Sequence, residues 1–439
     1  MIRKQLMDFR SSSNFLKLKE YTSNKIVKNI GWLFFDKFCR LGIGLFVGVW
    51  VARYLGPGSF GKWNYSIAVI AILSAISTLG LDQVLVKHLV ENESNEDQLV
   101  GTAFFMRFVG GILVTIIGCV YTYFQYNSLL LIITFLTALN VVFQSFDVID
   151  LKLQSVLKSK ISVIIKNSAF IIASILKLIV IYNKGSLLAF VIISLIEIVL
   201  GAVGLIFSYG FLRVLKWGFN IEYAKNFLAE CWPLLLSGII ILLYMRLDQV
   251  MIGNMLNETD VGFYSVSVKF SELWYFIPTV FANSFFPKLI KMKGSGVEYK
   301  KFCSKLLKIL FVISFFISIV LSLSAKTLIE TLYGTSYLAS ALALKISIWT
   351  SIFVFWGVGA ANMLLIENLN KHNLYKSIQG LVLNVLLNFF LIPRFGINGA
   401  AIATLISQFY ASYLYYLFPK STRHIFVLQS KSILFFLNI

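Results

Sequence analysis

The chain has 439 residues, of which 58% are hydrophobic and only 13% are charged, and its formal net charge is +19. Soluble domains are roughly half apolar and about one quarter charged, so a soluble fold cannot bury this excess of apolar surface. The composition excludes a soluble enzyme, and with 28 glycines and six prolines it also excludes a collagen-like or low-complexity chain. A polytopic membrane protein remains. In a soluble chain this positive charge would suggest a nucleic-acid partner. Here the question is where the Lys and Arg residues lie relative to the bilayer.

Twelve apolar runs are long enough for membrane-spanning helices, which need about 20 residues each. The runs are continuous rather than alternating, which favours helices over the strands of a barrel. In the first half they cover residues 31–51, 63–81, 99–124, 129–148, 161–182 and 187–209. In the second half they cover residues 233–255, 266–287, 306–325, 344–366, 378–393 and 399–418. We therefore predict an all-α membrane protein with about 12 transmembrane helices.

Lys and Arg are unevenly distributed among the segments that connect these runs. With the N-terminus in the cytoplasm, 26 of them fall in cytoplasmic segments and six in outer segments. Cytoplasmic loops of membrane proteins carry such an excess, so both termini are predicted to be cytoplasmic. Residues 1–30 then form a basic cytoplasmic segment beside anionic lipid, because they lack the short apolar core and cleavage site of a signal peptide.

The two halves of the chain resemble each other. Residues 51–61 and 252–262 follow the first and seventh runs at an offset of 201, and residues 181–185 and 392–396 match at an offset of 211. The chain is therefore predicted to hold two six-helix bundles around a central cleft, as parallel repeats related by a pseudo-twofold axis along the membrane normal. This is a usual plan of transporters, and a channel or a scaffold is the alternative. The N-terminal bundle, the cytoplasmic linker, the C-terminal bundle and the cytoplasmic tail cover residues 31–210, 211–232, 233–418 and 419–439.

Seven Lys and Arg and four Asp and Glu are assigned to the interior of the spans, an excess of three positive charges. A charge at the bilayer centre costs about 2.5–3.5 kcal/mol on insertion scales, so it faces protein or water and usually marks a functional site. Because the guanidinium of Arg binds phosphate through two hydrogen bonds, excess cations predict an anionic substrate such as a phosphate or pyrophosphate. The cations are Lys37, Arg40, Arg107, Lys166, Lys177, Arg246 and Lys269. The acids, which are candidates for binding a coupling proton or sodium ion, are Asp36, Glu197, Asp248 and Glu272.

Several of these charges also have a purely structural interpretation. Asp36 and Arg40 are spaced to form an ion pair on one helix face, and so are Lys269 and Glu272. The glycines near Arg40 either open space around the guanidinium or let helices pack closely. Lys166 and Lys177 lie toward opposite ends of one span, from which long side chains can reach the membrane surface.

Motifs that would indicate other functions are absent from the sequence. There is no Walker A motif, so ATP is not the direct energy source. The four cysteines and three histidines have neither metal-ligand nor disulfide-framework spacing. The outer loops are too short for a catalytic domain of ordinary size, which argues against a membrane glycosyltransferase or polymerase. We therefore expect no enzymatic activity, no cofactor, no metal and no nucleic-acid partner.

Five motifs in register resemble those of polysaccharide biosynthesis flippases, the Wzx-type O-antigen and capsule translocases. The similarity extends from about residue 29 to residue 418. The motifs are ARYLGPGSFG at 52–61, TLGL at 78–81, RLDQVMIG at 246–253, SELWYFIP at 271–278, and NVLLNFFLIP at 384–393, which leads into RFGINGAAIAT at 394–404.

The resemblance implies the fold of the multidrug/oligosaccharidyl-lipid/polysaccharide exporter superfamily, with two six-helix bundles in a V around a cleft. It implies a protein of the bacterial cytoplasmic membrane that moves an undecaprenyl-pyrophosphate-linked oligosaccharide, an O-antigen or capsule repeat unit, from the inner to the outer leaflet. Membrane lipids, and the polymerase and chain-length regulator of the same pathway, are the further partners it suggests. A cation-coupled multidrug exporter on the same fold is the alternative.

The resemblance also implies site residues. Related lipid-linked precursor flippases place cleft arginines of the first and seventh spans on the pyrophosphate, and Arg40 and Arg246 occupy comparable places here. Arg53, at the outer end of the first span, is a further candidate. This sequence departs from the pattern in having an acid, Asp36, one turn from Arg40. The other candidate ligands of the anion are Lys37, Arg107 and Lys269.

Overall fold

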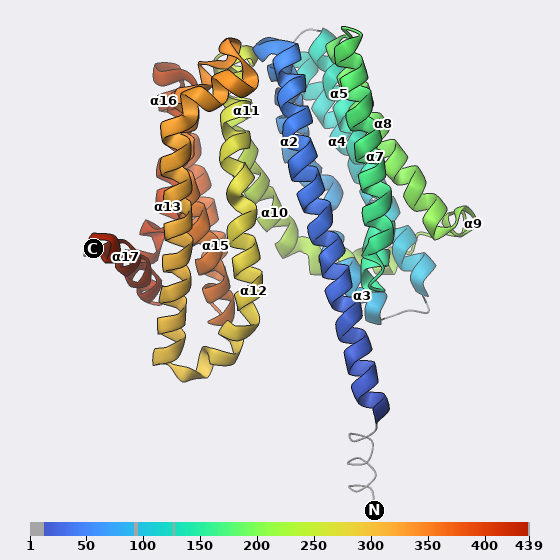
Figure 1. Ribbon diagram of the computed structural model, residues 1–439. Coiled ribbons are helices and arrows are strands. Elements are labelled where there is room, and N and C mark those ends of the chain that lie inside the picture. The colour runs from blue at the N-terminus through green and yellow to red at the C-terminus, as the bar shows by residue number, and fades with distance from the viewer. Residues whose placement is uncertain (1–12, 92–94, 126–127, 438–439) are drawn as a thin grey trace, which may run out of the picture. The chain divides into compact units, whose positions relative to one another are not determined.

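The computed structural model describes residues 13–91, 95–125 and 128–437 of the chain. Every regular element within these ranges is a helix, as Figure 1 shows, and this confirms the predicted all-α class. The chain forms two compact units, each assembled from more than one segment.

The first unit comprises the described residues up to Gly48, together with Ile76–Val120 and Phe135–Leu235. In its core, one apolar face of a short helix packs on another short helix: Leu81, Leu85 and Leu89 are fully buried beside Val148 and Ile149. The elements that contribute to this unit are α2 (Ser13–Thr78), α3 (Leu81–Glu91), α4 (Glu96–Gln125), α5 (Ser128–Phe143), η2 (Gln144–Asp147), α6 (Val148–Ser155), α7 (Ser159–Tyr182), α8 (Leu187–Tyr209), α9 (Phe211–Val214) and the start of α10 (Ile221–Met255).

The second unit comprises Val49–Ala75, Tyr121–Thr134 and the chain from Leu236 onward. Its largest core cluster combines aliphatic and aromatic side chains, and the rings of Phe311 and Trp356 stack with their centroids 5.3 Å apart. Beyond α10, its elements are α11 (Glu258–Glu272), η3 (Leu273–Tyr275), α12 (Phe276–Met292), η4 (Lys293–Ser295), α13 (Val297–Tyr333), η5 (Thr335–Tyr337), α14 (Ser340–Ser347), α15 (Thr350–Ile366), α16 (Lys371–Ser412), η6 (Leu414–Leu417) and α17 (Arg423–Leu437).

Nine helical segments of the described residues are long and apolar enough to cross a membrane. They are Phe35–Glu91, Glu96–Gln125, Ser128–Ser155, Ser159–Tyr182, Leu187–Tyr209, Ile221–Met255, Val297–Tyr333, Ser340–Ile366 and Lys371–Leu417. The first and last of these have 57 and 47 residues, more than twice the length of about 20 that one crossing needs. Each covers nearly all of two predicted spans, and the predicted span 266–287 falls on α11 and α12, which are individually shorter than 18 residues. The number of twelve spans stays a prediction.

The two repeat segments break their helices at matching positions. Gly56 interrupts α2 with a φ of 71°, a left-handed conformation that glycine adopts without strain. Asn257, which is 201 residues later, separates α10 from α11. Its side chain caps α11 by accepting a hydrogen bond from the backbone N–H of Asp260 at 3.0 Å. The repeats therefore achieve the same break by two different local means.

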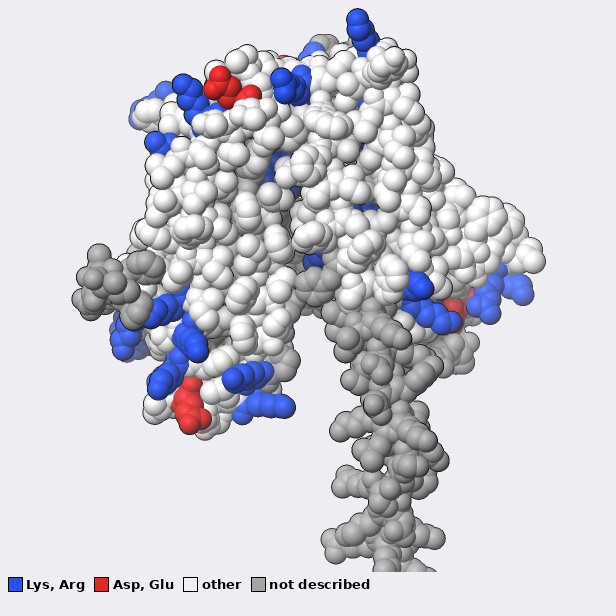
Figure 2. Space-filling view, viewed as in Figure 1, with Lys and Arg blue, Asp and Glu red and all other residues white. Residues whose placement is uncertain are grey.

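Charge is concentrated at helix ends, as α13 illustrates. Figure 2 shows Lys side chains clustered where α12 turns into α13 and an uncharged stretch along the middle of α13. The cluster includes Lys291, Lys293, Lys300 and Lys301, and residues 309–325 of the same helix contain no charge. This distribution suits a helix whose middle lies in hydrocarbon and whose end lies among lipid head groups.

Candidate functional site

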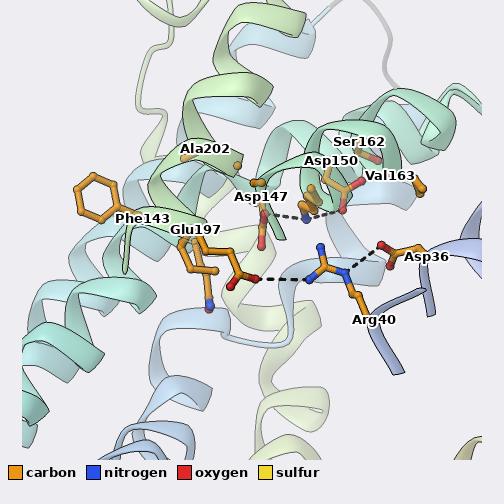
Figure 3. Close-up of a pocket in the computed structure, with 14 residues that line it drawn as sticks. Asp36, Arg40, Phe143, Asp147, Asp150, Ser162, Val163, Glu197 and Ala202 are labelled. Carbon is orange, nitrogen blue, oxygen red and sulfur yellow. Dashed lines mark hydrogen bonds and ion pairs between the residues drawn. The ribbon is translucent and has the colours of Figure 1, made fainter. Parts of the chain in front are cut away.

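A polar cavity of about 270 Å³ lies inside the first unit (Figure 3). Its charged lining comes from helices that are distant in sequence but adjacent in the fold. The four carboxylates are Asp36 of α2, Asp147 of η2, Asp150 of α6 and Glu197 of α8. The two cations are Arg40 of α2 and Lys166 of α7. The lining therefore has more negative than positive groups.

Arg40 is held between two of these carboxylates. Its Nε donates to Asp36 Oδ1 at 3.0 Å, which confirms the pairing predicted from their spacing, and its Nη1 lies 3.9 Å from Glu197 Oε1. The guanidinium carbon also lies 5.4 Å from the ring centroid of Phe170, a cation–π geometry. Asp36 in turn accepts a hydrogen bond from Asn167 Nδ2 at 2.9 Å. Arg40 thus links α2 to α7 and α8.

Lys166 and Lys177 of α7 are paired as well. Lys166 Nζ lies 2.8 Å from both Asp147 Oδ1 and Asp150 Oδ2, and Lys177 Nζ lies 3.4 Å from Glu197 Oε2. Sequence reasoning missed both acids, because Asp147 is the last residue but one of the apolar run 129–148 and Asp150 lies just beyond that run. The short connection between α6 and α7 was the available signal, since two helices joined by a tight turn bring their adjoining ends together.

The second unit holds a buried carboxylate, Asp248 of α10, whose side chain is surrounded by neutral donors. Tyr264 Oη donates to Oδ2 at 2.8 Å, Asn388 Nδ2 donates to Oδ1 at 2.6 Å, and Thr404 Oγ1 also donates to Oδ2. Among the described residues, no Lys, Arg or His forms an ion pair with Asp248. Asp248 therefore differs from the other three acids, each of which pairs with an arginine.

Arg246 and Glu272 form an ion pair across α10 and α11, with Nη2 of the arginine 3.2 Å from Oε2 of the glutamate. Glu272, which the sequence placed near Lys269, thus has an arginine partner from another helix. Both side chains of the Arg246 pair are about one quarter exposed. Asp248 and Glu272 line the same small cavity of about 50 Å³.

The remaining predicted cations line neither of these two cavities. Lys37, Arg53 and Lys269 are exposed on their helices. Arg107 is buried in the first unit, where its guanidinium bonds Asp82 at the start of α3. The structure therefore brings Asp36, Arg40 and Glu197 together in one unit and Arg246, Asp248 and Glu272 together in the other.

Among the described residues, at least five of the seven cations that the sequence assigns to the spans have a carboxylate within ion-pair distance. They are Arg40, Arg107, Lys166, Lys177 and Arg246. The sequence count gave an excess of three positive charges, but it left out acids near helix ends. Two of these acids, Asp82 and Asp150, form ion pairs with Arg107 and Lys166. In the described part of the chain, no three His, Cys, Asp or Glu side chains are grouped so that they could hold a metal ion.

Comparison with known proteins supports this fold and identifies the family of the chain. A relative named "Probable flippase AglR" from Haloferax volcanii is 26% identical over 176 residues, which are 39% of this chain and 37% of that protein. An inward-facing multidrug resistance MATE family transporter of the MOP superfamily superposes with a TM-score of 0.72 at 15% identity, covering 89% of this chain and 96% of its own. The lipid II flippase MurJ, in an inward closed conformation, gives 0.69 at 14% identity, covering 93% and 91%.

The family model of the polysaccharide biosynthesis proteins matches residues 50–342, which is more than half of the chain. The match includes four of the five motifs in full and confirms the resemblance that they indicated. Nearly whole-chain similarity to the MATE and MurJ structures likewise confirms the superfamily fold. The chain is thus a multi-pass membrane protein that belongs to the polysaccharide biosynthesis protein family and has the fold of the MOP superfamily.

Proposed function

We propose that this protein is a flippase that moves an undecaprenyl-pyrophosphate-linked oligosaccharide, an O-antigen or capsule repeat unit, across the bacterial cytoplasmic membrane. The family match over residues 50–342 carries this proposal, and the names of two relatives, a probable flippase and a lipid II flippase, support it. Both termini face the cytoplasm in this proposal, and the bundles at 31–210 and 233–418 open alternately to the two leaflets. The polymerase and chain-length regulator of the pathway are its protein partners.

We assign the first contact with the pyrophosphate to Arg246. A polyanion approaches most easily where the surrounding carboxylates are fewest, and Arg246 has one ion-pair partner, whereas Arg40 lies between two. Arg246 is also partly exposed, so that its guanidinium can exchange Glu272 for phosphate oxygens. Lys37, Arg53 and Lys269 are exposed cations that can attract the anion at longer range. Arg40 and Arg107 have structural roles in this proposal.

Asp248 is the acid that we assign to coupling. Asp36, Glu197 and Glu272 are each ion-paired with at least one basic side chain of the protein, Asp36 and Glu197 with Arg40, Glu197 also with Lys177, and Glu272 with Arg246. Asp248 has neutral donors around it, so a proton or a sodium ion would supply the positive charge that the protein does not. The energy of the ion gradient would then enter the second unit at α10, which carries Asp248, and at α11 and α16, which supply the donors.

The test of the proposed function is a deletion of the gene in the bacterium that carries it. The deletion strain should lose long surface polysaccharide and accumulate the lipid-linked repeat unit on the inner leaflet, and the wild-type gene should reverse both effects. Normal surface polysaccharide in the deletion strain would refute the proposal. Transfer of a sugar by the purified protein would point instead to an enzyme.

A cation-coupled multidrug exporter is the second candidate, because MATE transporters share the fold and because a buried carboxylate suits cation coupling in either kind of protein. The two candidates differ in cargo. An exporter would make cells resistant to cationic dyes in a manner that depends on Asp248, and it would leave surface polysaccharide unchanged. Loss of polysaccharide without any change in dye efflux favours the flippase.

A further inference from the structure

A second large cavity, of about 500 Å³, lies inside the second unit between α10, α12, α15 and α16. Its walls are mainly apolar and include Ile240, Ile241, Val354, Val358 and Ala361. Cavities of about 300–1,000 Å³ with apolar walls and a few placed polar groups are typical of small-molecule sites. The proposed function uses none of these wall residues.

One cation, Lys376 of α16, lines this cavity. Its side chain is buried, with 8% of the residue exposed. Its Nζ donates to Tyr416 Oη at 2.9 Å and lies 5.4 Å from the centroid of the same ring. Within the described ranges no Asp or Glu forms an ion pair with Lys376, in contrast to the five paired cations described above.

The environment of Lys376 defines the chemistry of a ligand. A buried ammonium group without a counter-ion is unfavourable, and a hydroxyl and an aromatic face compensate for only part of the lost hydration. The Tyr416 hydroxyl takes one of the three N–H donors, so the others can bind an anion. Apolar walls disfavour a small, strongly hydrated anion on its own and favour hydrocarbon. The complementary molecule is an anion attached to a hydrocarbon chain.

The position of Lys376 along its helix agrees with such a ligand. Lys376 lies five residues from the start of α16 at Lys371, at the end that the predicted topology places at the cytoplasmic leaflet. Lipid phosphates lie at that depth, with their chains directed toward the middle of the bilayer. We propose that this cavity binds a phosphate-bearing membrane lipid, whose head group pairs with Lys376 and whose chain lies along the apolar walls. This proposal depends on the predicted placement of the start of α16 at the cytoplasmic leaflet. It does not depend on which molecule the flippase transports.

The test is lipid binding by the purified full-length protein, measured by native mass spectrometry together with the shift in melting temperature. Undecaprenyl phosphate should bind and raise the melting temperature, whereas undecaprenol and inorganic phosphate, each of which lacks one half of the ligand, should bind at least tenfold more weakly. Phosphatidylglycerol is tested as well, to distinguish the two kinds of lipid that could occupy the site. Binding of both phosphate lipids indicates a general lipid site. Binding of undecaprenyl phosphate alone indicates a site for isoprenoid lipids. Both results support the proposal. If neither of the two phosphate lipids binds, the proposal is overturned.

Two variants and two controls localise the binding. Lys376→Met should weaken phosphate-lipid binding at least tenfold, yet it should melt no lower than the wild type without lipid, because the substitution removes a buried charge. Ala361→Trp fills the cavity, leaves the charge in place and should also abolish binding. Lys376→Arg should keep most of the affinity, and Lys371→Met, an exposed lysine on the same helix, should bind as the wild type does. Unchanged affinity in both Lys376→Met and Ala361→Trp would refute the site, whether or not surface polysaccharide depends on the protein.

Discussion

Gly61 and Gly262 are equivalent residues of the two repeats, and each packs against the backbone at the start of the other repeat's helix. A Cβ atom added at Gly61 would lie 1.7 Å from the carbonyl oxygen of Glu258, and one added at Gly262 would lie 2.1 Å from that of Pro57. Pro57 and Glu258 are separated by 201 residues, as the two glycines are. The contact is therefore reciprocal, as a pseudo-twofold relation between the repeats requires. Both halves of the contact lie within the second unit.

Alanine at either glycine should destabilise the second unit, because a helical backbone cannot move away from a new methyl group as a flexible side chain can. Overpacking of this kind costs about 1–3 kcal/mol, so Gly61→Ala and Gly262→Ala should each lower the melting temperature in detergent by several degrees. Gly238→Ala is the matched control: it lies in the same unit, and nothing stands within 4 Å of its added Cβ. It should melt at or above the wild-type temperature. Equal melting temperatures for the three variants would contradict the close approach.

Reversing the Arg246–Glu272 pair should separate its structural role from its binding role. Arg246→Gln alone should abolish flipping of the lipid-linked unit in vesicles and lower the melting temperature slightly, since partly exposed pairs contribute only up to about 1 kcal/mol. The double variant Arg246→Glu with Glu272→Arg restores an ion pair, so it should recover the melting temperature. It should not recover flipping, because the guanidinium now stands on α11 rather than on α10. Recovery of both properties would show that Arg246 is only structural.

Replacing Asp248 should uncouple the protein without unfolding it. Asp248→Asn keeps the shape of the side chain but removes the negative charge, and its amide N–H groups then face some of the donors that the carboxylate accepts from. We expect flipping driven by an imposed proton or sodium gradient to fall at least tenfold. Exchange between leaflets without a gradient should persist. Thr404→Val, which removes one donor and keeps the charge, should have the smaller effect. Gradient-driven flipping at the wild-type rate in Asp248→Asn would place coupling elsewhere.

The helices of this fold could be predicted from the sequence because apolar runs and helix breakers are local signals. Gly56 and its counterpart Asn257 lie in the segments that follow the first and seventh apolar runs, and the helices break at both residues. The number of membrane crossings is harder to predict from the sequence. Kinked helices join neighbouring apolar runs, and the turn at η3 divides the segment 258–292 into two short helices. Division of a membrane helix depends on packing, which single-sequence periodicity does not contain.

The candidate site was predictable only where its partners share a helix. The Asp36–Arg40 pair follows from a spacing of four residues. The contacts of Arg107 with Asp82 and of Arg246 with Glu272 join separate helices, so a tally of charges within spans could not find them. Lys376 lies just before the predicted run 378–393, in a cytoplasmic segment of the predicted topology, so the sequence did not indicate that its side chain is buried.

Arg40 should prove to be a structural residue of the first unit rather than a ligand of the cargo. Arg40→Gln leaves Asp36 and Glu197 without its positive charge, so it should lower the melting temperature. Adding Asp36→Asn removes one of these carboxylates, and the double variant should therefore be more stable than Arg40→Gln alone, by roughly 1 kcal/mol for a partly exposed pair. Lys37→Gln, its exposed neighbour in the chain, should melt as the wild type does. Loss of flipping by Arg40→Gln at an unchanged melting temperature would instead return Arg40 to the pyrophosphate site.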